Sequence, residues 1–417
     1  MKICVVGSGG REHALADALA ADGDDVVVAP GNAGMALVGV SCTPAPLEEV
    51  AADLFVVGPE APLVDGLADR LRGAGSAVFG PGSDGAMLEG SKAWMKSLLV
   101  EAGVPTAAHG TFTVANEAHA FLDGLPGPYV VKTDGLAGGK GVAVVDDLDA
   151  ARAAVDDYLS GAAFGDAGRT VVIEEALAGA EVSVLAVCDG HRAVALAPAR
   201  DYKRVGDGDT GSNTGGMGAY SPVPDAPAQV VDSVMADAVE PTLAALRARG
   251  IDYRGVLYAG LMLTADGPRV LEYNVRFGDP EAQVVLPRID GGLAELLSQA
   301  ASGSLRDEPR FVDDAAVTVV AACEGYPASP RTGDRITGVT EAEEQPGVSV
   351  FFAGVGDDEE GDGLVTTGGR VLSVTGTGAS VGGARELAYR GLAGLSWPGM
   401  QYRTDIAARA AGEVERS

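Results

Sequence analysis

Positive charge is scarce in this sequence of 417 residues. Lysine and arginine together number 30 against 59 aspartates and glutamates, which gives a formal net charge of −29 at pH 7. Such a surface repels the phosphates of nucleic acids and the anionic headgroups of lipids unless a basic patch compensates locally, and the sequence shows no such patch. We therefore exclude nucleic acids and membranes as the main partners.

Cysteine and long apolar runs are also rare. The four cysteines lie far apart without a Cys-x-x-Cys pair, so neither a zinc knuckle nor a disulfide framework is expected. No run approaches the roughly 18 apolar residues of a membrane helix, and the N-terminus lacks a signal-peptide pattern. We expect a cytoplasmic protein with reduced, mostly buried cysteines: Cys4, Cys42, Cys188 and Cys323.

Lysine is the scarcest basic residue, and the chain contains only Lys2, Lys92, Lys96, Lys132, Lys140 and Lys203. Together with abundant Asp, Glu, Gly and Ala, this depletion is typical of a protein from a high-salt cytoplasm, where molar salt screens the repulsion between negative charges. An ordinary acidic protein with lysines placed by chance is the alternative. On the halophilic interpretation, the remaining lysines are candidates for chemistry.

The length corresponds to roughly two to four domains, and the pattern suggests four parts. Residues 1–102 alternate short apolar and helical segments, which predicts a Rossmann-like α/β domain with a parallel sheet. Its strands end in Gly-rich or Pro-Gly turns, where open α/β sheets bind ligands, so we expect a small anionic ligand there. The other three parts are 103–190, 191–310 and 311–417.

The first turn, Gly7-Ser8-Gly9-Gly10, is an incomplete dinucleotide fingerprint. The third glycine would fall at Glu12, and the second strand ends in Ala29-Pro30 where an NAD-binding fold usually offers an acidic residue to the ribose. Classical NAD binding is therefore not expected.

A second Gly-rich loop lies within residues 103–190, where the pattern changes to strands and hairpin-like turns. It is not a Walker P-loop, because Gly141 follows Lys140 where serine or threonine is required. An ordinary glycine hairpin is the alternative. Lys132 and Lys140 bracket this loop in a lysine-poor chain, which favours a functional role.

A strand near residue 274 carries the most informative pattern of residues 191–310. This part begins with a long polar, Gly-rich stretch and ends in a hairpin that turns at 265–267. Alternation along the second strand places Leu271, Tyr273, Val275 and Phe277 on one face and Glu272, Asn274 and Arg276 on the other. The Glu and Asn oxygens suit Mg²⁺, and the arginine suits a developing phosphoryl charge. An exposed strand face with a surface ion pair is the alternative.

The last part, 311–417, shows strands and a helix near 381–395, and we expect an α+β domain that closes the core of the third part. The acidic loop 357–362 is expected to be a solvated turn. This part shows no chemistry of its own.

Eight segments, taken in order, resemble the ATP-grasp ligases and, among them, the glycinamide ribonucleotide synthetase family. They are VVGSGGREHALA, APGNAG, VVGPEAPLVDGLAD, FGPGSDGAMLEGSKAWMK, VVKTDGLAGGKGV, IEEALAGAEVS, DYKRVGDGDTGSNTGGMGAYSP and LEYNVRFGDPEAQ. The resemblance spans essentially the whole chain. It implies that an ATP-grasp fold, with a small lid subdomain at 103–190 and a large subdomain at 191–310, follows the N-terminal domain.

The same resemblance implies a step of de novo purine biosynthesis. ATP, glycine and 5-phosphoribosylamine would give glycinamide ribonucleotide, ADP and phosphate through a glycyl phosphate, with Mg²⁺ or Mn²⁺ as cofactor and a monomeric enzyme. Such chemistry needs lysines on the phosphates, a mobile Gly-rich lid and an arginine for the transition-state charge.

Roles at the nucleotide follow from the resemblance by position. Lys132 and Arg276 are implied to be catalytic, and Glu272 and Asn274 to bind the metal. The implied nucleotide-binding residues are Lys92 and Lys132 at the phosphates, Gly135, Gly138, Gly139, Lys140 and Gly141 in the lid loop, Glu174, Glu175 and Leu177 at the adenine, and Glu181 at the ribose.

Roles at the other two substrates are implied in the same way. Gly9, Gly10 and Arg11 are suited to the ribose phosphate. The polar stretch would grip the substrates through Asp201, Lys203, Arg204, Asp209, Asn213, Gly215, Gly216, Met217 and Gly218.

The sequence departs from the family pattern at a few positions. Ser212 replaces the usual proline, and Gly139, Thr133 and Tyr273 are mild changes. Several ATP-grasp relatives carry a further metal carboxylate twelve residues before the Glu-x-Asn pair, where this chain has Gly260. The metal would therefore depend more on phosphates and water.

Two other functions are open at this point. A carboxylating ATP-grasp ligase would share Lys132, Glu272, Asn274 and Arg276, but the polar stretch and VVGPEAPLVDGLAD favour the glycine-dependent enzyme. A nucleotide-binding regulatory protein is the non-enzyme alternative, and the intact Lys, Glu, Asn and Arg positions argue against it.

Overall fold

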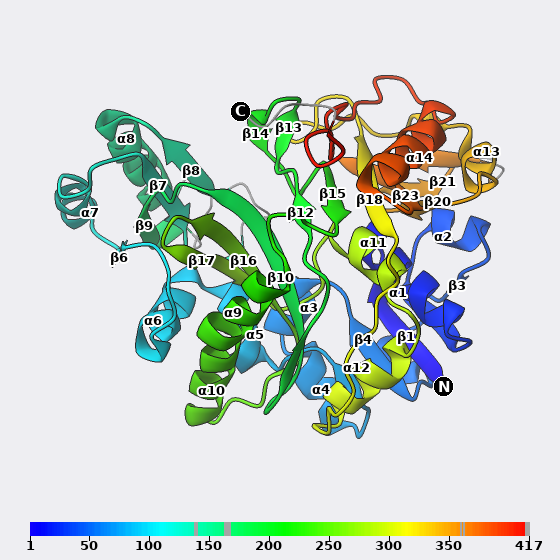
Figure 1. Cartoon of the computed structure of the whole chain (residues 1–417), viewed down its shortest axis with the longest axis horizontal. Coiled ribbons are helices and arrows are strands. Elements are labelled where there is room, and N and C mark those ends of the chain that lie inside the picture. The colour runs from blue at the N-terminus through cyan, green and yellow to red at the C-terminus, as the bar shows by residue number, and fades with distance from the viewer. Residues whose placement is uncertain (137–140, 162–167, 359–360, 362, 413–417) are drawn as a thin grey trace.

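The computed structural model describes residues 1–136, 141–161, 168–358, 361 and 363–412. Figure 1 shows a small sheet with helices α7 (Ala115–Leu122) and α8 (Leu148–Leu159) at one end of the long axis, and the first and last parts of the chain together at the other end. Within the described ranges, no helix is long and apolar enough to cross a membrane.

The N-terminal part is a five-stranded parallel sheet in the order β3-β2-β1-β4-β5, as predicted. Its central strands are buried apolar runs because helices pack on both faces. The strands are β1 (Lys2–Gly7), β2 (Asp25–Pro30), β3 (Ser41–Cys42), β4 (Leu54–Val57) and β5 (Val78–Phe79). The helices are α1 (Gly10–Ala21), α2 (Ala33–Leu37), α3 (Glu60–Val64), α4 (Leu67–Gly73), α5 (Ser83–Gly90) and α6 (Lys92–Ala102).

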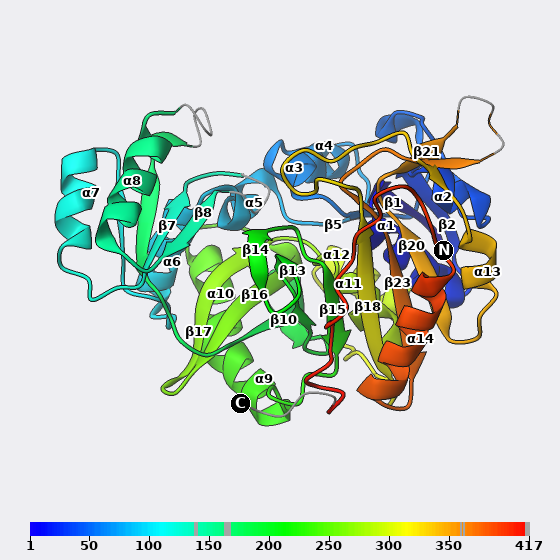
Figure 2. The same ribbon diagram turned by 90° about the horizontal axis from the view of Figure 1, so that it is seen from above.

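The small sheet contains four strands in the order β6-β9-β7-β8, all of which pair antiparallel. Its strands are β6 (His109–Phe112), β7 (Tyr129–Thr133), β8 (Val142–Val145) and β9 (Val171–Glu175). Helices α7 and α8 cover one face and bury Ala118, Leu122, Ala151 and Val155 against Val131 and Ile173. Figure 2 shows this unit projecting from the rest of the molecule.

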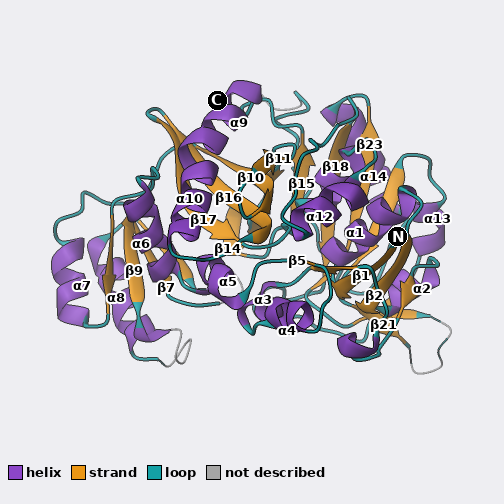
Figure 3. Ribbon diagram, turned by 90° about the horizontal axis from the view of Figure 1, so that it is seen from below, coloured by secondary structure: helices purple, strands orange, loops and turns teal. Residues whose placement is uncertain are grey.

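The large sheet, β11-β10-β16-β17, contains the strand with the Glu-x-Asn-x-Arg pattern. Its strands are β10 (Ala180–Asp189), β11 (Ala193–Ala195), β16 (Arg254–Thr264) and β17 (Gly267–Asn274). Helices α9 (Ala228–Val234) and α10 (Glu240–Ala248) lie beside it and are joined by a π-helical turn, Met235–Val239 (Figure 3). Further helices are α11 (Ala282–Val285) and α12 (Leu293–Ala301).

The C-terminal sheet takes strands from two of the predicted parts, in the order β12-β15-β18-β23-β20. The polar stretch supplies β12 (Arg200–Asp201) and β15 (Gly218–Ser221), and β15 pairs with β18 (Ala315–Ala322). The other strands are β20 (Val348–Phe352) and β23 (Arg370–Gly378), and α14 (Val381–Ala393) packs on β23. Smaller elements are β13 (Arg204–Gly206), β14 (Thr210–Asn213), β19 (Arg335–Ile336), β21 (Val355–Asp357), β22 (Leu364–Thr366) and α13 (Val339–Glu343).

The hydrophobic cores divide the molecule differently from the sheets. One cluster joins Cys4 of β1, Val184 of β10, Val319 of β18 and Leu392 of α14. A second joins β1, β10, α12 and β20. The cluster of the small sheet contains only residues between 112 and 173, as far as the described chain shows. The small sheet therefore has its own core, whereas the rest of the molecule, which we call the body, shares cores along the whole chain.

Candidate active site

A cavity of about 880 Å³ lies where the small sheet, the large sheet, the polar stretch and the N-terminal part meet. Most of the described residues predicted for the site line it: Arg11, Lys92, Lys132, Gly135, Gly141, Glu174, Glu175, Leu177, Glu181, Asp201, Lys203, Arg204, Asp209, Asn213, Gly215, Glu272, Asn274 and Arg276. Segments that are more than 250 residues apart thus contribute to one hollow.

Some predicted residues lie elsewhere. Gly9, Gly10, Gly216, Met217 and Gly218 are not among the lining residues, and the Met217 side chain is fully buried. Gly138, Gly139 and Lys140 fall outside the described residues, so the roles predicted for them in the lid loop stay predictions.

The small sheet and α6 form a basic wall of the cavity. The Lys92 ammonium, at the first turn of α6, donates to the carbonyl oxygen of Gly135 at 2.9 Å. Burial lowers the pKa of Lys92, while the carboxylate of Glu272 opposes that shift. Lys132, on β7, forms an ion pair with Glu174 at 2.8 Å and donates to the carbonyl of Leu271 at 3.3 Å. Two of the chain's lysines therefore face the space where phosphates would lie.

The Glu174 side chain, at a position that the resemblance implies for the adenine, points to two lysines. Its side chain is only 1% exposed and lies between Lys132 and Lys96, whose ammonium is 2.9 Å from Glu174 Oε2. The neighbouring Glu175 accepts a hydrogen bond from the backbone N–H of Ala108. The sequence prediction missed Lys96, although its position four residues after Lys92 on one helix was an available signal.

Strand β17 forms the opposite wall and follows the predicted alternation with one exception. Tyr273, Val275 and Phe277 are each 1% exposed, whereas Glu272, Asn274 and Arg276 are partly exposed and line the cavity, which Tyr273 also borders. Leu271 was predicted on the same face as Tyr273, Val275 and Phe277, but it is partly exposed and lines the cavity beside Glu272. The cause is a register shift in which Gly260 pairs with Glu272 and Leu261 pairs with Val270, so that Leu271 has no opposite residue.

Glu272 and Asn274 fit a Mg²⁺ or Mn²⁺ site with few protein ligands. A Cβ at Gly260 would come within 3.2 Å of Glu272 Cγ, so the position where relatives carry a carboxylate does lie beside Glu272. Among the described residues, no group of three or more His, Cys, Asp or Glu side chains is arranged to hold a metal ion. One carboxylate and one amide oxygen suit Mg²⁺, which completes its shell with water and phosphate oxygens.

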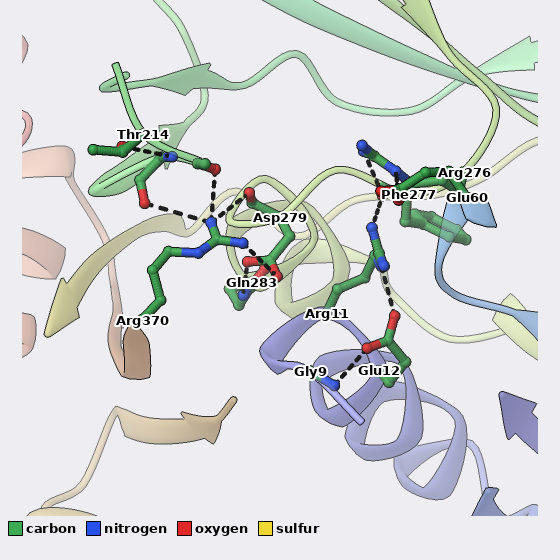
Figure 4. A network of polar contacts seen from close by, with 12 residues as sticks. Gly9, Arg11, Glu12, Glu60, Thr214, Arg276, Phe277, Asp279, Gln283 and Arg370 are labelled. Atoms are coloured by element: carbon green, nitrogen blue, oxygen red, sulfur yellow. Dashed lines mark hydrogen bonds and ion pairs between the residues drawn. The ribbon is translucent and has the colours of Figure 1, made fainter. Parts of the chain in front are cut away.

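Arg276 lies between two carboxylates of the N-terminal part that the sequence prediction missed. Its guanidinium donates to Glu89 at 2.8 Å and to Glu60 at 3.2 Å. Burial alone would lower the pKa of Arg276, but these carboxylates raise it above its usual value. Figure 4 shows Arg11 beside it, donating to the carbonyl of Phe277. Arg276, which the resemblance implies as the charge stabiliser, is thus fixed to the N-terminal part.

A second arginine cluster, also visible in Figure 4, lies at the substrate end of the cavity. Arg370, from β23, pairs with Asp279 at 3.1 Å and donates to the carbonyl of Gly215 at 2.6 Å. Gln283, which is 1% exposed, donates to Asp279 at 2.9 Å. The C-terminal part therefore contributes a cavity residue, Arg370, whereas the sequence suggested no chemistry there.

The polar stretch is held from two sides. The ammonium of Lys203 lies 2.7 Å from Asp201 and 3.3 Å from Glu181. Arg403, which is fully buried near the C-terminus, donates to Asp209 at 2.7 Å and to the carbonyl of Arg204 at 3.1 Å. The predicted ribose and substrate residues are thus paired with one another or with the C-terminal segment.

Two sheets that enclose a cavity, with Lys132 on one, Lys92 of α6 beside it, and an acid-amide-arginine strand face on the other, are typical of an ATP-grasp enzyme. Three family models match the chain, namely phosphoribosylglycinamide synthetase N domain at residues 1–89, ATP-grasp (A) domain at 90–282 and C domain at 316–409. Together they cover most of the sequence. The chain belongs to the phosphoribosylglycinamide synthetase family.

Individual proteins give the same result. A phosphoribosylamine--glycine ligase of Streptomyces coelicolor is 50% identical over 99% of this chain and 100% of its own length, and that of Leifsonia xyli is 49% identical over 98% and 100%. The crystal structure of the phosphoribosylamine--glycine ligase of Thermotoga maritima superposes with a TM-score of 0.85 at 36% identity and covers 98% of this chain and 100% of its own. A biotin carboxylase of Campylobacter jejuni shares the fold, with a TM-score of 0.70 at 14% identity over 96% of this chain and 92% of its own.

Proposed function

We propose that this protein catalyses the ATP-dependent ligation of glycine to 5-phosphoribosylamine in de novo purine biosynthesis, giving glycinamide ribonucleotide, ADP and phosphate. The cavity carries this proposal. It brings Lys92 of α6, Lys132 of the small sheet, the Glu-x-Asn-x-Arg face of β17 and the polar stretch into one hollow of about 880 Å³. That volume lies within the range of small-molecule sites.

The chemistry divides into two steps. A carboxylate oxygen of glycine attacks the γ-phosphorus of ATP, which forms glycyl phosphate and releases ADP. The amine of phosphoribosylamine then attacks the acyl carbon and expels phosphate, with loss of a proton from nitrogen. Lys92 and Lys132 hold the phosphates as point charges, and Arg276 stabilises the charge that develops on the transferred group.

The metal and the remaining site residues belong to the same proposal. Glu272 and Asn274 would hold Mg²⁺ or Mn²⁺, which supplies charge neutralisation at the phosphates when bound. Leu177 and the backbone beside Glu174 and Glu175 would border the adenine, and Glu181 the ribose. Arg11, with the adjacent Gly9 and Gly10, and the polar stretch with Asp201, Lys203, Arg204, Asp209 and Asn213 would hold the amine substrate and glycine.

The domain boundaries and the cellular setting are also proposals. We propose a division at about residues 102, 190 and 310, supported by the change of pattern along the chain, and a monomer in a high-salt cytoplasm, supported by the net charge of −29. Gel filtration of the purified protein at molar KCl tests the monomer.

The test of the activity is steady-state ADP release measured with each substrate omitted in turn. We expect ADP beyond one equivalent per enzyme only when ATP, glycine and phosphoribosylamine are all present. A carboxylating ligase would instead require bicarbonate, and a regulatory protein would bind ATP without turnover. Either result would contradict the proposal.

A further inference from the structure

A buried triad of charged side chains lies behind the basic wall of the cavity. Glu174 of β9 contacts two lysines at once, Lys132 at 2.8 Å through Oε1 and Lys96 at 2.9 Å through Oε2. Lys96 is 0% exposed, Glu174 is 1% exposed and Lys132 is 7% exposed. A lysine is almost never fully buried without a partner, so Lys96 requires an explanation.

Lys96 does not reach the cavity itself. Lys132 and Glu174 are lining residues, whereas Lys96 is not among them. Its ammonium also donates to the hydroxyl of Thr106 at 2.7 Å, and that hydroxyl donates to the carbonyl of Val270 at 2.6 Å. Lys96 can therefore act on a bound ligand only indirectly, and Glu174 is the cavity residue with which it forms an ion pair.

The charges within the triad do not cancel. Two lysines and one glutamate leave one net positive charge, and the lysine on the cavity side is Lys132. Burial lowers the pKa of Lys96 to about 8, so it is charged at neutral pH, with Glu174 opposing the shift. Burial would raise the pKa of Glu174, but attraction to Lys132 and Lys96 lowers it, so the carboxylate is ionised.

Without Lys96, the net charge of the triad at the cavity wall would change. Glu174 would then have Lys132 as its single partner in this triad, and the pair would be neutral. Because charges a few ångströms apart interact strongly in a poorly hydrated interior, the carboxylate would offset most of the attraction between Lys132 and a phosphate. The other charged groups around the triad, Lys92 of α6 and Glu272 of β17, would remain as they are.

We infer that Lys96 is a positioning residue that neutralises Glu174, so that Lys132 keeps its positive charge for the phosphates of ATP. The inference rests on the proposed function, because it presumes that ATP occupies the cavity. Lys96 acts on nucleotide binding without touching the nucleotide. A purely structural lysine would affect adenosine and ATP alike, whereas a charge-balancing lysine affects only the phosphates.

The test is a charge-compensation cycle on the full-length chain. Binding of ATP and of adenosine is measured by calorimetry for the native protein, Lys96→Met, Glu174→Gln and the double variant, with Lys2→Met as a matched control at an exposed lysine. We expect Lys96→Met to bind ATP at least about tenfold more weakly. We expect adenosine binding to be unchanged, because adenosine carries no phosphate.

The double variant gives the decisive result. It removes both charges and leaves Lys132 positive, so ATP affinity should recover to within about threefold of the native value. The effects of the two single substitutions on ATP binding should therefore not be additive. Glu174→Gln alone should also retain ATP affinity. A folded double variant that binds ATP as weakly as Lys96→Met, or an equal loss for adenosine and ATP, would overturn the inference.

Two further outcomes remain informative. If Lys96→Met does not fold, Glu174→Gln and the double variant still test the inference. If Lys96 balances charge, both variants keep their affinity for ATP. If the ion pair is only structural, both variants lose that affinity. If the native chain binds no ATP, the proposed function is wrong rather than the role of Lys96 within it.

Discussion

The small sheet and the body are stabilised in different ways. The body shares hydrophobic cores between β1, β10, β18 and α14, which lie far apart in the sequence. The small sheet has a core of residues 112–173, and the side-chain contacts described above between it and its surroundings are polar: Lys96 with Glu174, Lys132 with the Leu271 carbonyl, and Lys92 with the Gly135 carbonyl. An independent core with polar attachments allows one part to change position while keeping its own structure.

This comparison also divides the chemistry. The strand with Glu272, Asn274 and Arg276 is fixed in the body by buried neighbours and by the carboxylates of Glu60 and Glu89. Lys132 belongs to the small sheet, on β7. We therefore expect substitutions in the body wall to stop turnover and substitutions in the small sheet to weaken ATP binding.

The largest effect is expected for Glu272→Gln. Loss of the carboxylate that faces the metal position should reduce turnover at least about a hundredfold. The fold should persist, because Glu272 is a cavity residue and not a core residue. Steady-state ADP release and the melting temperature check both points, with Glu117→Gln, an exposed glutamate of α7, as control. A near-normal rate would remove β17 from the active site.

A core substitution in the small sheet separates the two regions directly. Ile173 is 0% exposed, and Ile173→Ala should cost about 2–5 kcal/mol. Because its core is separate, we expect faster amide hydrogen exchange in β7 and β9 and unchanged exchange in β1 and β18. Leu185→Ala, at a fully buried position of β10, should instead affect the body. Equal changes in both regions would show that the cores are coupled.

The body should have its own pH dependence, centred on His13 of α1. His13 is 4% exposed, and its Nδ1 accepts a hydrogen bond from the Phe352 N–H at 3.1 Å, so it joins α1 to β20. Burial lowers its pKa from 6.5 to about 4. Between these values the unfolded chain binds a proton that the folded chain does not. The free energy of unfolding should thus fall by about 3 kcal/mol as the pH drops through this window.

Denaturant titrations between pH 4 and 7 measure this dependence. In His13→Gln, an amide oxygen can still accept the hydrogen bond but does not titrate, so the slope in this window should decrease. An unchanged slope would assign the pH dependence to other groups.

Lys132→Ala should have a smaller effect on activity than Glu272→Gln. The effect should fall mainly on ATP binding, because Lys132 belongs to the small sheet. We expect the KM for ATP to rise about tenfold and glycyl phosphate formation to slow, since one phosphate-directed charge is lost. Lys2→Ala, at an exposed position outside every motif, is the control. If Lys132→Ala and Lys2→Ala change the KM for ATP equally, the scarcity of lysine in this chain does not identify functional lysines.

The smallest effect is expected from salt. Raising KCl from low to molar concentration shortens the Debye length from about 30 Å to about 3 Å and should raise the melting temperature, by roughly 2–4 °C for each kcal/mol of repulsion removed. Substrate binding should weaken only modestly, because the phosphate-directed lysines are mostly buried. A melting temperature that stays flat or falls would contradict the high-salt interpretation and leave the activity untouched.

The sequence predicted those features that depend on local pattern. The parallel N-terminal sheet and the buried face of Tyr273, Val275 and Phe277 follow from apolar periodicity, and both are confirmed. Leu271 was wrong because a bulge adds one residue to a strand without changing its pattern. Periodicity carries no information about such an insertion.

Contacts between distant segments were beyond a single sequence. Lys96 and Glu174 are 78 residues apart, and Arg370 and Asp279 are 91 residues apart. The sequence does not show which of these side chains pair, because only the fold brings each one beside its partner. The C-terminal part therefore showed no chemistry in the sequence, although it supplies Arg370 to the cavity.

The distribution of the cores also has a consequence for synthesis on the ribosome. Residues 112–173 contain all the described members of the small sheet's core cluster, so we expect this unit to fold while the chain is still being made. The body cannot, because Ile3 of β1 shares a cluster with Phe351 of β20, and Cys4 shares one with Ala407. Nearly the whole chain must leave the exit tunnel before these cores close, so the nascent body has to keep its apolar strands from aggregating for most of translation.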